Sequence, residues 1–140
     1  MIVLACGEIY LLNENRAALV NLWMEQAQKS LETAFLSLSA GAYSDAANRS
    51  YNCIFHSMRA MLASDGFDSK QHTSVILEFK RRYILKGVIE ASFSKPIEEA
   101  FEARNTGGDK PKNISEEKVR NQTESAKSLF FAVENYIKGL

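Results

Sequence analysis

Apolar residues recur every three or four positions along most of the chain, the spacing that buries one stripe of an α-helix. The first stripe consists of Leu19, Leu22, Trp23, Ala27, Leu31, Ala34, Phe35 and Leu38. Asn15 can cap the amide end of this helix, and Gly41 is a residue at which it can stop. The pattern therefore predicts a long helix over 15–39.

Start and stop signals predict four further helices. They run from about Ser44 to Ser64, from His72 to Leu85, from Ser94 to the break at Gly107-Gly108, and from Ser115 to Gly139. No stretch shows the two-residue alternation that is typical of a strand. We therefore predict one all-α domain over 14–140, an up-and-down bundle of four to five helices with one shorter pair. Residues 1–13 are expected to form an N-terminal extension that packs on the body or on a neighbouring chain.

The composition is ordinary for a globular domain, with 46% hydrophobic and 24% charged residues. The formal net charge is zero, so any contact with RNA depends on a local patch or a partner. Cys6 and Cys53 are expected to be free thiols in a reducing cytoplasm. No run approaches the roughly 18 apolar residues that a membrane helix needs, and the apolar run in MIVLACGEIYLL is too short for an export signal.

The second predicted helix carries an unusual polar face, in the stretch AANRSYNCIFHSMRAMLASDG. Arg49 and His56 are seven positions apart and share this face, about 10.5 Å apart along the axis. Asn52 and Arg59 fall near the same line. The opposite side is the predicted core: Ala47, Tyr51, Ile54, Phe55, Met58 and Leu62.

Small residues lie between the polar ones on this face: Cys53, Ala60 and Ala63. Small side chains let another backbone come close, so the face can pack against a loop, a second chain or a ligand. Three interpretations remain open: a solvated face with internal hydrogen bonds, a polar interface with a partner, and a site that binds phosphate or acts on RNA. Arginine's planar fork suits phosphate, and histidine exchanges protons near neutral pH.

Other candidate residues lie outside this helix. His72 opens the third helix and is read as a capping or packing residue. The basic cluster Lys80, Arg81, Arg82 and Lys86 is a solvated face or a contact to RNA or an acidic partner. Arg104, Asn105 and Asp109 stand at and beyond the end of the fourth helix, where the loop 107–113 can present them to a ligand. Metal-ligand spacings and cofactor motifs are lacking, so neither metal nor cofactor is expected.

The order of these motifs resembles the HEPN domain (higher eukaryote and prokaryote nucleotide-binding). The segments that carry the resemblance are GAYSDAANRSYNCIFHSMRAMLASDG, SKQHTSVILEFKRRYILKG and the helix ending in FEAR. The pattern A-x-x-R-x-Y-x-x-x-F-H of the small prokaryotic single-domain branch is present as Ala46, Arg49, Tyr51, Phe55 and His56, with Lys70 and His72 as a Lys-x-His pair. The resemblance covers about residues 14–138.

The resemblance implies a homodimer built through helix faces and an operon partner, often a minimal nucleotidyltransferase, in toxin–antitoxin-like pairs. In active relatives it implies a metal-independent ribonuclease with an Arg-x4–6-His motif at the dimer interface. Here Arg104-Asn105 matches the first half, but no histidine follows, and Asp109 is followed by Lys110 where related members often have tyrosine. Arg49 and His56 have an Arg-x6-His spacing, but on one helix about 10 Å apart.

The leading hypothesis is therefore a HEPN-domain protein that binds RNA, nucleotide or a partner enzyme, without robust nuclease activity. The first alternative is a metal-independent ribonuclease toxin that uses Arg104 or Arg49 with His56. The second is a purely structural dimeric interaction module, in which the face from Arg49 to Arg59 only holds the dimer together.

Overall fold

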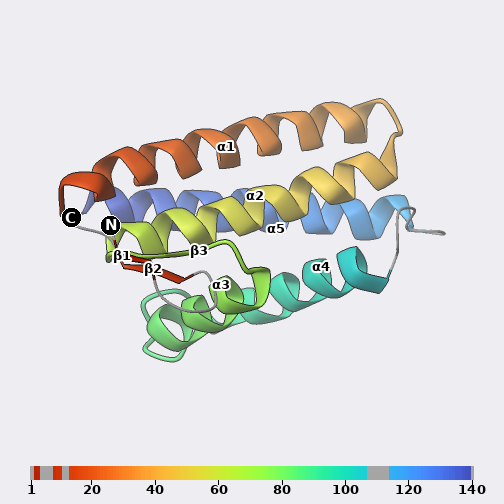
Figure 1. Ribbon diagram of the computed structural model, residues 1–140. Coiled ribbons are helices and arrows are strands. Elements are labelled where there is room, and N and C mark those ends of the chain that lie inside the picture. The colour runs from red at the N-terminus through yellow and green to blue at the C-terminus, as the bar shows by residue number, and fades with distance from the viewer. Residues whose placement is uncertain (1, 4–7, 11–12, 107–113, 140) are drawn as a thin grey trace.

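The protein, seen as a computed structural model, is described over residues 2–3, 8–10, 13–106 and 114–139. It contains the five predicted helices (Figure 1): α1 (Asn13–Ser39), α2 (Tyr43–Ser64), α3 (His72–Phe79), α4 (Ser94–Thr106) and α5 (Glu116–Lys138). The all-α, up-and-down bundle with one shorter pair of helices is confirmed. Asn15 lies within the first turn of α1 rather than at its cap, because the helix begins two residues earlier.

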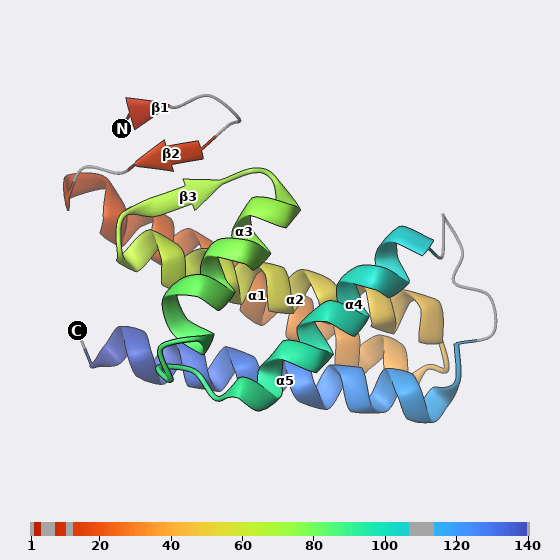
Figure 2. The same cartoon turned by 90° about the horizontal axis from the view of Figure 1, so that it is seen from below.

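Helix α2 lies at the centre of the bundle. It packs against α1 and α5 on one side and against α3, α4 and the strand β3 (Phe67–Ser69) on the other. Figure 1 shows α1, α2 and α5 side by side, and Figure 2 shows α3 and α4 crossing over them. A central helix is apolar over most of its circumference, and this position places residues from α2 against every neighbouring element.

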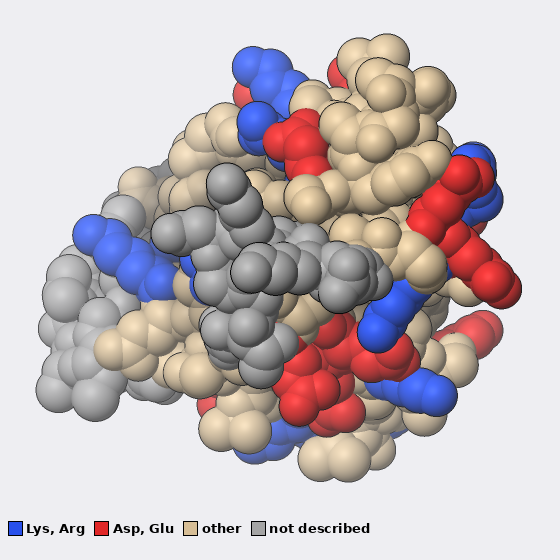
Figure 3. All heavy atoms as spheres, turned by 90° about the vertical axis from the view of Figure 1, so that its right-hand side faces the viewer, with Lys and Arg blue, Asp and Glu red and all other residues tan. Residues whose placement is uncertain are grey.

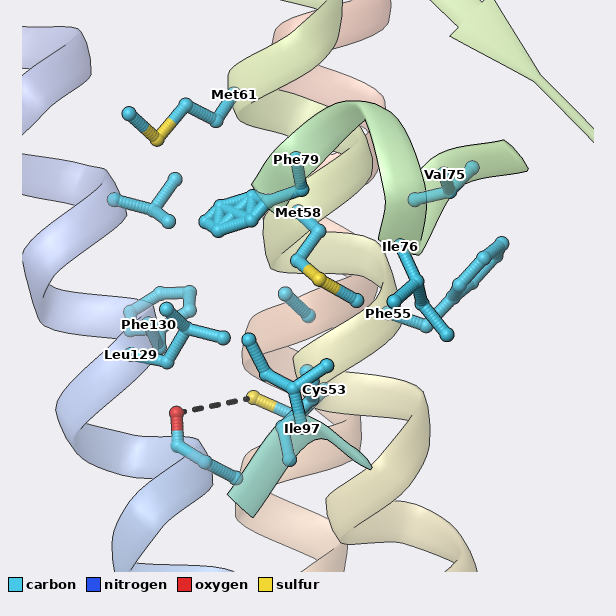
Figure 4. Packing of buried hydrophobic residues seen from close by; sticks show 14 of the residues in the cluster. Cys53, Phe55, Met58, Met61, Val75, Ile76, Phe79, Ile97, Leu129 and Phe130 are labelled. Atoms are coloured by element: carbon cyan, nitrogen blue, oxygen red, sulfur yellow. Dashed lines mark hydrogen bonds between the residues drawn. The ribbon is translucent and has the colours of Figure 1, made fainter. Parts of the chain in front are cut away.

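The hydrophobic core fills the space between α2, α3, α4 and α5 (Figure 4). Phe79 of α3 is fully buried beside Met58 and Met61 of α2. All six residues predicted for the apolar face of α2 are buried. In α1, Leu22 belongs to the predicted buried stripe but is 41% exposed. Val20, two positions earlier, was not in the predicted stripe and is buried.

A small antiparallel sheet lies beside the bundle, although no strand was predicted. Strands β1 (Ile2–Val3), β2 (Glu8–Tyr10) and β3 follow one another in the order β1-β2-β3. The expectation of no strand was therefore wrong for these segments. All three residues of β3 are buried, so no alternation marks it, and its conformation depends on pairing with β2. The described part of the N-terminal extension thus lies against the body of the same chain.

The third predicted helix changes its winding halfway. After α3 the chain continues as a π-helical turn over Lys80–Ile84, in which the Leu85 N–H donates to the Lys80 carbonyl at 2.9 Å. This turn places the Tyr83 hydroxyl against the carboxylate of Asp65, and Tyr136 of α5 donates to the same carboxylate at 3.1 Å. The wider turn thereby ties the end of α2 to α5.

Charges of both signs are interspersed at the end of the molecule where α5 begins (Figure 3). Arg120 pairs with Glu116 there at 3.0 Å, and the Tyr43 hydroxyl donates to the same carboxylate at 2.6 Å. Ser115 caps α5 as predicted, because its side chain accepts from the Lys118 N–H at 3.1 Å. Among the described residues, no helix is long and apolar enough to cross a membrane.

Candidate functional site

The polar face of α2 divides into an exposed and an enclosed part. Arg49 is exposed, and its Nε lies 3.8 Å from the carboxylate of Asp45 one turn earlier. His56 and Arg59 instead face α1 and β3 of the same chain, and Asn52 is half-buried one turn before His56. Arg49 is therefore in a different environment from His56 and Arg59, with which it was grouped on the predicted polar face.

The small residues of this face pack inside the protein itself. Cys53 is fully buried, and its Sγ lies 3.8 Å from the Ala126 carbonyl of α5 (Figure 4). Ala63 packs against Val20 of α1. The expectation that small residues make room for a loop, a second chain or a ligand is corrected: α2 is central, and they let α1 and α5 come close.

Arg59 forms a buried ion pair that joins three elements. Its Nη2 lies 3.0 Å from Oδ2 of Asp68 in β3, and its guanidinium carbon lies 3.9 Å from the centre of the Trp23 ring in α1. Only 11% of the Arg59 side chain and 3% of the Asp68 side chain are exposed. Both faces of Arg59 are thus occupied by its own chain, which is a structural arrangement.

His56 belongs to the same enclosed group. Its ring stacks on Trp23 with centroids 5.5 Å apart. Burial lowers the pKa of His56, and the charge of Arg59 also lowers it, although the Asn52 carbonyl opposes the shift. A neutral imidazole stacked on an indole is a packing histidine in this position.

His72 contacts two aromatic residues of α2. Its Nδ1 lies 2.6 Å from the Tyr51 hydroxyl, and its ring stacks on Phe55 with centroids 4.0 Å apart. Burial lowers the pKa of His72, and the positive charges of Arg104 and Arg59 lower it further. Gln71 occupies the cap position of α3, so His72 is a packing residue rather than a cap.

Arg104 of α4 reaches this same place. Its guanidinium carbon lies 5.4 Å from the centre of the Tyr51 ring, a cation–π contact. Burial raises the pKa of Tyr51 to about 12, while Arg104 acts in the opposite direction. We call Tyr51, Phe55, His72 and Arg104 the Arg104–His72 cluster. Three helices bring it together, and Arg104 and His72 are 32 positions apart in the sequence.

Sequence reasoning missed two members of this cluster. Tyr51 and Phe55 were assigned only to the core, and both are buried. The signal was present, because both belong to the A-x-x-R-x-Y-x-x-x-F-H pattern. Asn105 lies in α4, but its side chain is outside the described part of the chain, as is Asp109.

The basic cluster on the third helix is largely paired within the chain. Lys80 pairs with Glu98, while Arg81 and Arg82 both pair with Glu78. Arg82 also lies 5.0 Å from the centre of the Phe67 ring. Three of the four cations of the cluster are thus paired with two carboxylates of the same chain. The described residues include no group of three histidine, cysteine or carboxylate side chains that can hold a metal ion.

Both histidines should make the fold less stable in mild acid. Their pKa values are lowered in the native state, so below about pH 6.5 the unfolded chain binds more protons. Stability is therefore complete above pH 6.5 and decreases as the pH falls towards the native values. Urea midpoints between pH 7.5 and 5.5 should show this slope. It should flatten in His56→Gln and in His72→Gln, and an unchanged slope in both would contradict the assignment.

Comparison with known proteins gives the same picture over most of the chain. The HEPN domain model matches residues 20–136. A "UPF0332 protein" of Thermotoga maritima is 27% identical over 123 residues, covering 87% of this chain and 93% of that protein. "Putative toxin MJ0605" of Methanocaldococcus jannaschii is 30% identical over 94 residues, covering 67% and 70%. "Putative toxin MJ0142" of the same organism is 28% identical over 83 residues, covering 59% and 56%. With its helical bundle and this match, the chain belongs to the HEPN domain family.

Proposed function

We propose that this protein is the RNA- or nucleotide-binding component of a toxin–antitoxin-like system, without robust nuclease activity. Two relatives carry the word toxin in their names, which supports a toxin-like role. A minimal nucleotidyltransferase is the proposed partner, and a homodimer is the proposed assembly, both following from the family resemblance. The site proposed for the nucleic acid is the Arg104–His72 cluster.

The observation that supports binding is the position of Arg104. Its exposed guanidinium lies over the ring of the buried Tyr51, whose hydroxyl contacts His72, and it makes no ion pair among the described residues. An exposed arginine held on an aromatic face can bind phosphate with its fork of donors. Because no histidine follows Arg104, the family's catalytic motif is incomplete, and we expect binding without efficient cleavage.

The test is an RNA-binding and RNA-cleavage assay in EDTA on the wild type and on Arg104→Ala, with a melting curve for each. Wild type should bind RNA and leave it intact, and Arg104→Ala should bind several-fold more weakly, since one charge-assisted contact is lost. Arg49→Ala is the matched control, because Arg49 is an exposed arginine outside the cluster. Equal binding by all three proteins would contradict the proposed site.

A second candidate function is a metal-independent ribonuclease, and the structure favours a particular version of it. His56 is stacked between elements of the bundle, whereas His72 is the histidine on which Arg104 acts. A rearranged site would therefore use Arg104 with His72 rather than with His56 or Arg49. Cleavage in EDTA that disappears in Arg104→Ala and His72→Gln, but persists in His56→Gln, would establish this function and overturn the first.

The purely structural alternative makes a different prediction for α2. If the face only holds a dimer, Arg49→Ala should weaken self-association, measured by sedimentation, and leave RNA binding unchanged. Arg49 is the exposed cation of that face, so its removal should not disturb the core. If self-association is unchanged in Arg49→Ala, this face of α2 does not hold the dimer together.

A further inference from the structure

The Arg104–His72 cluster combines two groups that repel each other when both are charged. Arg104 always carries its charge, and His72 gains one only on protonation. The titratable and charged groups that act on His72 are Tyr51, His56 and Arg59 of α2 and Arg104 of α4. The carboxylate of Asp68 in β3 is bound by Arg59. The charges of Arg104 and Arg59 both disfavour protonation of His72, and the Arg104–His72 cluster as defined contains no carboxylate.

Arg104 differs from Arg59 and Arg82 because its N–H groups are not engaged by a carboxylate of the described residues. Arg59 is held by Asp68, and Arg82 by Glu78. Arg104 is exposed, and within the described part of the chain no carboxylate lies at ion-pair distance from it. Its guanidinium rests on the Tyr51 ring, and this contact holds it in place without using its N–H groups.

The orientation of His72 is fixed from two sides. Tyr51 engages Nδ1 at 2.6 Å, and Phe55 covers one face of the ring. The Tyr51 side chain is 1% exposed, so the hydroxyl cannot move away without disturbing the core. Nε2 is then the ring nitrogen left for a ligand, and it carries a proton when the Tyr51 hydroxyl donates to Nδ1. A second proton, taken from solvent, binds Nδ1, and the Tyr51 hydroxyl then accepts from this N–H instead of donating.

We propose that Arg104 and His72 together hold one phosphate group of a nucleotide or RNA, that His72 takes up a proton when the phosphate binds, and that Tyr51 is the positioning residue for His72. This binding mode rests on the proposed function and adds to it a pH dependence. A bound phosphate supplies the missing negative charge, so it favours the protonated imidazole that burial and Arg104 disfavour. Binding therefore strengthens as the pH falls.

The test uses the dinucleotide thymidylyl-thymidine as its probe. Its single phosphodiester keeps one negative charge between pH 5 and 8, and it lacks the 2′-hydroxyl that cleavage would need. Ring signals of the histidines are followed by NMR across this pH range, with and without the probe. The chain has two histidines, so His56 is an internal control in the same sample.

We expect the titration midpoint of His72 to rise by about one pH unit at saturation with the probe, a shift typical of a nearby opposite charge. The midpoint of His56 should shift much less, because its electrostatic coupling to His72 is the weakest of those acting on that histidine. The dissociation constant should increase by about tenfold in total from low to high pH, because the ratio of its two limits equals ten raised to the shift of the midpoint. No saturable shift, or equal shifts of both histidines, would overturn the inference.

Two variants separate positioning from packing. Tyr51→Phe keeps the ring beneath Arg104 and removes only the hydroxyl, so it should bind several-fold more weakly and alter the imidazole nitrogen shifts of His72. His72→Gln should still bind RNA through Arg104, but without pH dependence. RNA binding that is lost in Arg104→Ala yet independent of pH in the wild type would overturn this inference alone. Absence of RNA binding at any pH would overturn the proposed function as well.

Discussion

Asp68→Ala should lower the free energy of unfolding by about 3–5 kcal/mol, because it leaves the buried charge of Arg59 without a partner. The Asp68 side chain is 3% exposed, and its carboxylate accepts hydrogen bonds from two nitrogens of the Arg59 guanidinium. Arg59 also lies on Trp23, so it cannot turn to water without breaking a contact to α1. Urea denaturation with a fitted midpoint and slope measures the loss.

Two comparisons decide what causes that loss. Arg120→Ala breaks an exposed pair, in which the side chains are 54% and 53% exposed, and should cost about 0–1 kcal/mol. The double variant Asp68→Ala, Arg59→Met should recover part of the loss, since an apolar replacement removes the unpaired charge. If Asp68→Ala costs no more than Arg120→Ala, the pair is not buried in solution as it is in the structure.

Gly66→Ala should cost about 1–2 kcal/mol for its left-handed backbone alone, with a smaller addition because the flexible end of the Arg16 side chain must move. Gly66 has φ of +90°, and a Cβ there would lie 2.5 Å from Nη2 and 2.9 Å from Cζ of Arg16. The guanidinium rests on the turn between α2 and β3 and would have to leave it. We therefore expect the second largest loss of stability at this position, again measured by urea denaturation.

Gly41 is the matched control for this change. Its φ is +76°, but a Cβ there would meet nothing within 4 Å. Gly41→Ala therefore reports the backbone cost alone, and the difference between the two variants reports Arg16. In an Arg16→Ala background the two glycine substitutions should become equal. A difference that persists in that background would show that Arg16 is not the cause.

Much of the bundle could be predicted because helices are local. The stripe that ends in Leu38, the serine cap at Ser115 and the glycine at Gly66 act over one or two turns, so their signals are visible in the sequence. Leu22 had the correct spacing but is exposed. Spacing predicts which side of the helix faces the core, but the packing of neighbouring helices decides how much of that side they cover. The strand β3 had no local signal, because its partner β2 lies more than 50 positions away.

The candidate site was predicted only in part, for a related reason. The family motif predicts a histidine four to six residues after Arg104, and none is present there. The ribonuclease alternative therefore paired Arg104 or Arg49 with His56 and left His72 as a capping or packing residue. Which histidine faces Arg104 depends on how α4 crosses α2 and α3, and no local pattern encodes that crossing. Arg59 was grouped with ligand residues, although Asp68 and Trp23 hold it inside the protein.

The sequence by itself determined the five helices, the apolar face of α2 and the family to which the chain belongs, because each depends on periodicity or on residues close together in the chain. Only the tertiary structure decided that α2 is central, that Arg59 is a buried structural cation, and that Tyr51 contacts both Arg104 and His72. These facts arise from long-range packing, in which the burial of one side chain depends on residues tens of positions away. The chemistry of the site therefore follows from the arrangement of α2, α3 and α4 rather than from a continuous motif.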